Sequence, residues 1–165
     1  MNLNAEENDF LRTHLNCDFE VFRLAGDAST RKYHRVICRS PSNDSTWALM
    51  SWEPFDNIES YPFLNVLSHF KECGILVPQV HSIDGKRGLV LLEDLGDLTL
   101  ERKFWENQDQ FQTLPFYKKT IDQLVKIHTT ASVNKNPPPV CQKIEFDSDK
   151  LLWELNYAKT HLLEG

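Results

Sequence analysis

The strand-like and the helical segments of this chain fall largely in separate halves of the sequence. Segments of alternating or continuous apolar residues, typical of strands, lie before residue 95, and from residue 99 onward apolar residues recur at helical intervals. A run of strands followed by a run of helices is typical of an α+β fold. The order predicts a sheet lobe with an N-terminal helix over residues 1–95 and a helical part over residues 96–165.

Two strands and a loop of small residues begin this sheet lobe. Residues 20–24 alternate polar and apolar, residues 33–38 resume that pattern, and the run Ala-Gly-Asp-Ala-Ser of residues 25–29 lies between them. A strand, a short loop and a second strand predict a hairpin. A third strand is expected at 47–52, and a buried strand at 88–92 runs into an acidic exit that contains glycine.

Helices are expected where apolar residues share one face of the chain. The segments with this pattern are 4–16, 61–73, 116–131 and 146–163. Gly74 follows the second segment, where a helix C-cap is expected. Asp147 or Ser148 is the candidate N-cap of the last segment.

The composition indicates a folded, acidic protein. The chain has 165 residues, of which 41% are hydrophobic, and this excludes intrinsic disorder. Its net charge of −6 disfavours a protein that coats nucleic acid, because phosphate affinity comes from Lys and Arg. The cysteines stand far apart with no Cys-x-x-Cys spacing, which favours reduced thiols over a disulfide framework. Residues 1–10 lack the features of a signal peptide and no stretch is long enough to span a membrane, so the expected location is the cytoplasm.

The hairpin loop has the composition of a phosphate-binding loop. Small residues let backbone N–H groups approach an anion, hydroxyl groups add donors, and Arg31 or Lys32 adds positive charge. The alternative is an ordinary hairpin turn whose basic residues are solvated. With a single glycine, the loop is neither a Walker loop nor a dinucleotide fingerprint.

The exit of the last strand is the second candidate site. Residues 91–97 read Leu-Leu-Glu-Asp-Leu-Gly-Asp, so an apolar strand stops abruptly in acidic residues and glycine. Such an exit can present backbone groups to a planar ligand at a junction of two lobes, or it can be a strand end followed by a turn. The hairpin loop, third strand, helix and last strand follow one another in the order of a kinase amino-terminal lobe.

These segments resemble a known family. Residues 26–33, Gly-Asp-Ala-Ser-Thr-Arg-Lys-Tyr, resemble the Gly-Asp-Ala-Ser-x-Arg-x-Tyr signature of bacterial aminoglycoside-phosphotransferase-like kinases, nearest to the branch of anomeric N-acetylmuramate/N-acetylglucosamine sugar kinases. Residues 88–97 resemble the Gly-x-x-Leu-Leu-Glu-Asp-Leu-Gly-Asp hinge of that branch, and residues 63–78 resemble its helix with a Gly-x-x-Val-Pro exit. The resemblance runs collinearly over nearly all of the chain from residue 22.

The resemblance implies a bilobal, protein-kinase-like fold that binds ATP under the hairpin. Adenine would lie against the hinge backbone near residues 93–95, and residues 29–31 would face the phosphates. The chain would hold the amino-terminal lobe and the first helices of an incomplete helical lobe. The nucleotide-binding residues implied in this way are Gly26, Asp27, Ser29, Thr30, Arg31, Met50, Glu93, Asp94 and Leu95.

Two departures from the family limit what the chain is expected to do alone. Met50 stands where many kinases have a lysine for the nucleotide phosphates, which shifts phosphate contact toward Arg31 or Lys32. In the family the catalytic base and the Mg²⁺ ligands lie in a His-Gly-Asp…Asn loop and a later Asp, and none of the 6 histidines here has Asp two places later. No catalytic or metal-ligating residue is therefore assigned within the chain, and the pair Asp147 and Asp149 is interpreted as a helix cap.

The expected function is ATP-dependent phosphoryl transfer to a small molecule, in particular an amino sugar, with this chain supplying nucleotide binding. The alternative is a non-catalytic module, derived from such a kinase, that binds nucleotide or docks a partner. The expected partners are a nucleotide and a sugar, with no nucleic acid and no membrane. Apolar residues of the last helix are expected to promote self-association: Leu151, Leu152, Leu155 and Leu162.

The reading frame of the parent gene is expected to continue past Gly165 into a His-Gly-Asp…Asn segment and a later Asp. Sequencing the DNA downstream of the codon for Gly165 tests this expectation. A stop codon with no such segment before it would contradict the expectation for this chain.

Overall fold

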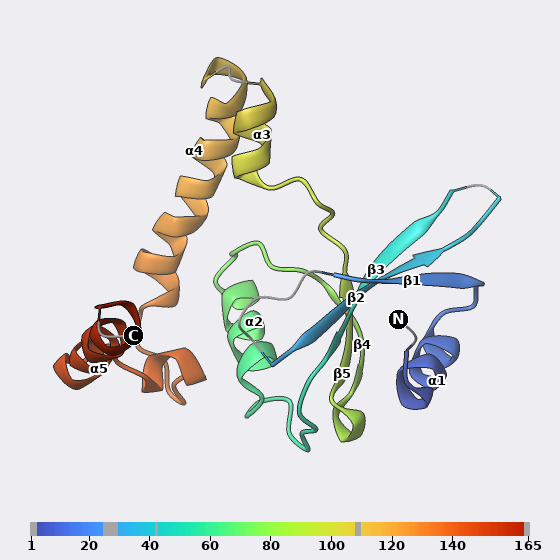
Figure 1. The fold of residues 1–165 in the computed structure, drawn as a ribbon, viewed down its shortest axis with the longest axis horizontal. Coiled ribbons are helices and arrows are strands. Elements are labelled where there is room, and N and C mark those ends of the chain that lie inside the picture. Colours follow the sequence, from blue (N-terminus) through green and yellow to red (C-terminus); the bar gives the residue numbers. More distant parts are fainter. Residues whose placement is uncertain (1–2, 25–29, 42, 108–109, 164–165) are drawn as a thin grey trace.

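The strands of the sheet lobe form one antiparallel sheet. The computed structural model describes residues 3–24, 30–41, 43–107 and 110–163. Neighbouring strands run antiparallel in the order β1-β2-β3-β5-β4 (Figure 1). The strands are β1 (Phe19–Arg23), β2 (Lys32–Cys38), β3 (Ser45–Ser51), β4 (Val80–Asp84) and β5 (Leu89–Glu93). The expected hairpin is β1–β2, and the α+β fold class is confirmed.

Two helices, α1 (Ala5–His14) and α2 (Pro62–Glu72), lie on opposite faces of this sheet (Figure 1). Alternate residues of a strand point to opposite faces, so neighbouring residues of β3 enter different cores. Leu49 lies in a buried cluster with Phe10 of α1. Met50, the next residue, lies in a second buried cluster with Leu64 of α2. With both faces covered, β5 is buried over residues 89–92.

Local signals fix the ends of both helices. α1 begins with a capping box, in which the Asn4 side chain accepts from the Glu7 N–H and the Glu7 side chain accepts from the Asn4 N–H. α2 begins at Pro62, whose missing N–H is not needed in the first turn. The C-cap of α2 is Cys73, and Gly74 follows it with a left-handed φ of 69°, so the C-cap lies one residue before the position expected from the sequence.

The helical part follows β5 and extends away from the sheet (Figure 1). It contains α3 (Leu100–Asn107), α4 (Gln110–Lys126), a π-helical turn (Ile127–Ala131), a 3₁₀ turn (Val140–Lys143), α5 (Ser148–Ala158) and a second π-helical turn (Lys159–Leu163). α4 and α5 confirm the helices expected in these regions. Asp147 is the N-cap of α5, because its side chain accepts from the Lys150 N–H at 2.8 Å.

α2 connects the sheet to the helical part by two kinds of contact. On the helical side, Nε2 of His69 lies 2.8 Å from the carbonyl oxygen of Ala131. The Val140 N–H also donates to Oδ1 of Asn65 at 2.7 Å. On the sheet side, α2 packs through apolar side chains around Met50. Hydrogen bonds therefore tie α2 to the helical part, and apolar packing ties it to the sheet.

Two cysteines form a disulfide, so the expectation of reduced thiols is wrong for this pair. Cys17 and Cys38 are joined with their Cα atoms 5.7 Å apart, although they are 21 positions apart in the sequence. The reason is strand register: Phe19 of β1 pairs with Cys38 of β2, which carries Cys17 to the same end of the hairpin. Among the described residues, Cys73 and Cys141 are free thiols.

The helical part exposes large apolar side chains. More than half of the surface of each apolar residue singled out from the sequence is accessible in and after α5: Leu151, Leu152, Leu155 and Leu162. The exposed apolar face is therefore confirmed, whereas self-association stays a prediction. In the part of the chain that the structure describes, no helix is long and apolar enough to cross a membrane.

We expect the chain to self-associate through this face, and light scattering over a concentration series measures the mass. Leu155→Lys should shift the chain toward monomer, because an interface would bury its charge without a partner. Leu76→Lys is the matched control, since Leu76 is 80% exposed but belongs to the sheet lobe. A wild-type chain that stays monomeric at every concentration would contradict the prediction.

Candidate functional site

A cavity of about 380 Å³, which we call the hinge pocket, lies where β5 leaves the sheet. The apolar part of its lining comprises Leu24, Ala48, Pro78 and Leu92. The polar part comprises Arg35 and the acidic exit, residues 93–97. Residues that are far apart in the sequence thus converge at the point where the sheet lobe passes into the helical part.

Strand register explains how these residues meet. Arg35 of β2 pairs with Ala48 of β3, and Ala48 pairs with Leu92 of β5. Paired residues of antiparallel strands share a face, so the three side chains form a row across the sheet. Ala48 has a methyl group in the middle of this row, which leaves space above β3 for a ligand and for the long Arg35 side chain.

The Arg35 guanidinium holds the acidic exit in place. Its Nε and Nη2 donate to the two carboxylate oxygens of Asp94 at 2.7 and 3.0 Å. Its Nη1 donates to Oδ2 of Asp97 at 2.6 Å. Oδ1 of Asp94 also accepts from the Gly96 N–H at 3.0 Å, and Gly96 has a φ of 76°, which favours glycine. We call this network of Arg35, Asp94, Gly96 and Asp97 the hinge clamp.

The hinge clamp sets the charge of its side chains. Burial raises the pKa of Asp94, but the hydrogen bonds that Asp94 accepts, above all from Arg35, outweigh burial and leave this pKa below its ordinary value. The hydrogen bond from Arg35 also lowers the pKa of Asp97. Hydrogen bonds to Asp97 and Asp94 in turn raise the pKa of Arg35. All three side chains are charged at neutral pH, and the two carboxylates leave the hinge clamp with a net negative charge.

The hairpin places a positive side chain on the α2 side of the sheet. Cζ of Arg31 lies 4.7 Å from the ring centroid of Trp52 and 5.7 Å from that of Phe63 in α2. Thr30 accepts a hydrogen bond from Nε1 of Trp52 at 2.8 Å. Arg31 and Phe63 line an apolar groove of about 360 Å³ along α2, which shares Pro78 with the hinge pocket.

Three further predicted residues lie outside the described residues: Gly26, Asp27 and Ser29.

The structure separates Met50 from the predicted residues of the hinge. Glu93, Asp94 and Leu95 all line the hinge pocket. Met50 is fully buried in the core cluster with Leu64. The side chain at this position therefore packs between the sheet and α2.

Arg35 and Ala48 are site candidates that the sequence alone does not single out. One signal was available for Arg35, because a charged residue in the middle of a strand needs a partner when it is shielded from water. Its partner Asp94 lies 59 residues away in the sequence, and strand order decides that they meet. For Ala48 the sequence carries no comparable signal, since a small apolar residue fits any half-buried strand.

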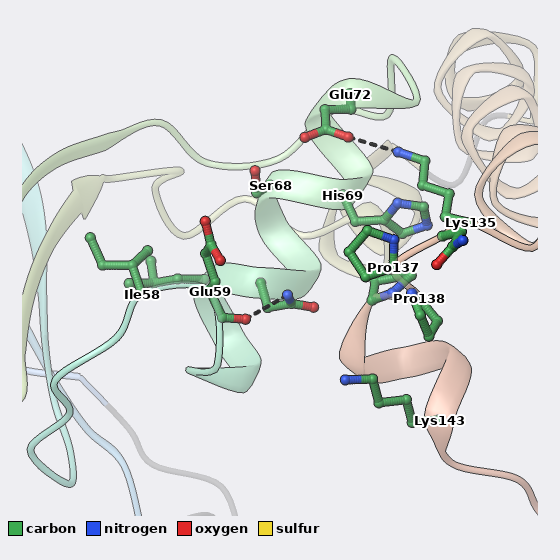
Figure 2. A pocket seen from close by; sticks show the side chains of 13 residues that line it. Ile58, Glu59, Ser68, His69, Glu72, Lys135, Pro137, Pro138 and Lys143 are labelled. Carbon is green, nitrogen blue, oxygen red and sulfur yellow. Dashed lines mark hydrogen bonds and ion pairs between the residues drawn. The ribbon is translucent and has the colours of Figure 1, made fainter.

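A larger cavity, of about 600 Å³, lies between α2 and the segment of residues 137–139 (Figure 2). Figure 2 shows Glu72 and Lys135 pointing toward each other, with Nζ of Lys135 donating to Glu72 at 2.7 Å. Asn65 of α2 accepts from the Val140 N–H on the same side. These contacts attach α2 to the helical part. We therefore interpret this cavity as part of the interface between α2 and the helical part.

The described residues contain no cluster of side chains suited to a metal ion. Within residues 3–24, 30–41, 43–107 and 110–163, no group of three or more His, Cys, Asp or Glu side chains could hold one. The pair Asp147 and Asp149 lies at the start of α5, where Asp147 acts as the helix cap. These residues do not fit a magnesium site, and no magnesium-dependent step is assigned to them.

A comparison with curated proteins finds a sugar kinase. Over 139 residues, the chain is 28% identical to a protein of Neisseria meningitidis serogroup B (strain ATCC BAA-335 / MC58) described as N-acetylmuramate/N-acetylglucosamine kinase. This similarity supports a relationship to sugar kinases. The match covers 84% of this chain, whereas the chain spans 38% of the relative's length. No protein-family model matches the chain.

The hinge clamp should make stability depend on acidic pH. A carboxylate whose pKa is lower in the folded chain than in the unfolded chain stabilises the fold above the unfolded pKa, and this contribution is lost as the pH falls through the folded pKa. The ordinary pKa of Asp94 is 3.8, and its folded pKa is lower. The free energy of unfolding, measured with urea, should therefore fall as the pH is lowered from about 5 toward about 2.

Asp94→Asn removes this titration, so the slope of the free energy of unfolding against pH should become shallower. Asp44→Asn is the control, because Asp44 pairs with Arg39 at an exposed site where the solvent screens the interaction. Equal slopes in the wild type and in Asp94→Asn would show that the hinge clamp makes no such contribution.

Proposed function

We propose that this chain is the nucleotide-binding part of an ATP-dependent phosphotransferase of the aminoglycoside-phosphotransferase type, with a protein-kinase-like fold. The proposed substrate is an amino sugar, such as a cell-wall sugar. The similarity to a protein described as N-acetylmuramate/N-acetylglucosamine kinase supports this substrate class. The resemblance of residues 26–33 and 88–97 to the family's loop and hinge supports the type of kinase.

The observation that carries the proposal is the hinge pocket. Leu24, Ala48 and Leu92 offer apolar surfaces on which a flat ring can lie, and the more polar segment of residues 93–97 lines the same pocket. A purine base suits this combination, because its ring faces are apolar and its edge carries hydrogen-bond donors and acceptors. We therefore assign the adenine of ATP to the hinge pocket.

The charges along the α2 side of the sheet support one orientation of the nucleotide. The hinge clamp carries a net negative charge, and Arg31 lines the groove that shares Pro78 with the hinge pocket. The negative hinge clamp repels phosphates, and the positive Arg31 side chain attracts them. The nucleotide would lie with its base at residues 94–97 and its phosphates under the hairpin.

The proposed reaction is phosphoryl transfer. A sugar hydroxyl oxygen forms a bond to the γ-phosphorus of ATP, the bond from that phosphorus to the oxygen bridging to ADP breaks, and the hydroxyl proton passes to a base. Magnesium would neutralise phosphate charge, and we propose that its ligands and the base follow Gly165. The described residues would bind and orient the nucleotide.

The second candidate is a module that binds nucleotide or docks a partner without catalysis. It is favoured for the chain taken alone, because none of the 6 histidines is followed two places later by Asp. Both candidates are proposed to act in the cytoplasm, with no nucleic-acid or membrane partner.

Isothermal titration with Mg·ATP tests the pocket. Ala48→Leu fills the middle of the hinge pocket and should weaken ATP binding by at least about tenfold, because its added carbons occupy the place of the base. Ala5→Leu is the matched control, since Ala5 is exposed at the start of α1. If the wild type and Ala48→Leu bind ATP with equal affinity, the assignment of adenine to this pocket is wrong.

ADP release with N-acetylglucosamine or N-acetylmuramate as acceptor tests whether the chain itself transfers the phosphoryl group. Sugar-dependent release supports the phosphotransferase, whereas ATP binding without release fits either the module or a nucleotide-binding part separated from its base and magnesium ligands. A wild-type chain that does not bind Mg·ATP contradicts the nucleotide-binding part of a kinase and the nucleotide-binding form of the module.

A further inference from the structure

We infer that Arg35 is a positioning residue for the nucleotide base: by holding Asp94 and Asp97, it keeps residues 94–97 in the shape that receives the base before any ligand arrives. This inference rests on the proposed function and deepens it. According to this inference, Arg35 raises the affinity of the chain for the nucleotide base and has no effect on the binding of the phosphates.

The geometry favours positioning over a loose surface contact. The side chains of Arg35 and Asp94 are 17% and 6% exposed, so their two parallel hydrogen bonds are largely shielded from water. Charge-assisted hydrogen bonds of this forked kind fix orientation as well as distance. A lysine at the same place would carry the charge but could not reproduce the fork.

The hinge clamp acts where regular backbone pairing stops. β5 ends at Glu93, whose N–H donates to the carbonyl oxygen of Gln79 as the strand closes. Beyond this point, Asp94 and Asp97 are held to β2 through Arg35. Loss of this hold would let the segment sample other conformations, and binding would then have to remove that freedom.

The position of Arg35 separates the two ends of the nucleotide. Its hydrogen bonds go to the hinge, whereas Arg31 lies at the hairpin against Trp52 and Phe63. A ligand with a base should therefore depend on Arg35, and a ligand made of phosphates alone should not. A merely structural role would instead weaken both ligands equally.

Isothermal titration of the 165-residue chain with ATP, adenosine and inorganic tripolyphosphate tests this difference. Arg35→Lys should weaken ATP and adenosine binding by about tenfold and change tripolyphosphate binding by less than about twofold. Arg39→Lys is the matched control, because Arg39 also pairs with two carboxylates, those of Glu20 and Asp44, but by one hydrogen bond each and at an exposed site. It should leave all three affinities unchanged.

Asp97→Asn keeps the test decisive if Arg35→Lys does not fold, as judged by circular dichroism. Asp97 is 66% exposed, so the change removes one charged hydrogen bond without leaving a buried unpaired charge. It should weaken adenosine binding by about threefold and spare tripolyphosphate.

Failure of the inference is distinguishable from failure of the proposed function. If the wild-type chain does not bind ATP, the proposed function is wrong. If the wild type binds ATP and both hinge variants bind adenosine as tightly as it does, the inference alone is wrong. Equal losses for adenosine and tripolyphosphate would also overturn it, because they would show a general structural effect.

Discussion

Burial of β5 on both faces is the constraint on which the rest of the structure depends. Leu89 and Leu91 enter the cluster with α1, and Val90 and Leu92 enter the cluster with α2. Burying a side chain of this size contributes about 1.5–3 kcal/mol, so a four-residue apolar run strongly fixes the strand. Because β5 is also paired with β3 and β4 on its two sides, its acidic exit emerges at one defined place in the sheet, and the hinge pocket is built around that place.

The hinge clamp is hard to explain by stability alone. Removing charges from water is costly, and well-packed apolar residues often stabilise a protein as much as a buried ion pair does. An apolar side chain at Arg35 would not, however, hold a segment by directed bonds. The directed hydrogen bonds between Arg35 and Asp94 therefore agree with a role in holding the hinge segment in one conformation. The two carboxylates around one guanidinium also give the hinge clamp its net negative charge.

The sequence predicts what short-range patterns encode. Alternation indicated β1 and β2, helical spacing indicated α2, and single residues marked helix ends at Gly74 and Asp147. The fold class follows from the order of these elements. The division at residue 95, which came from the order of the elements, and the kinase-like fold, which came from resemblance, stay predictions.

What the sequence could not predict depends on register between distant strands. The pairing of β1 with β2 joins Cys17 to Cys38, and the order β2-β3-β5 brings Arg35 to Asp94. Strand alternation places Met50 in the core cluster with Leu64, and its assignment to nucleotide binding stays a prediction. The assignments of Gly26, Asp27 and Ser29 fall outside the described residues and stay predictions.

The unequal attachment of α2 has a mechanical consequence. Hydrogen bonds have preferred directions, whereas apolar packing has none and tolerates sliding. If the two parts of the molecule move, α2 would travel with the helical part, to which His69 and Asn65 bind it, and would slide beneath the sheet. Such a movement of α2 would change the width of the groove beside Arg31. The hinge clamp would keep its shape, because Arg35 belongs to β2.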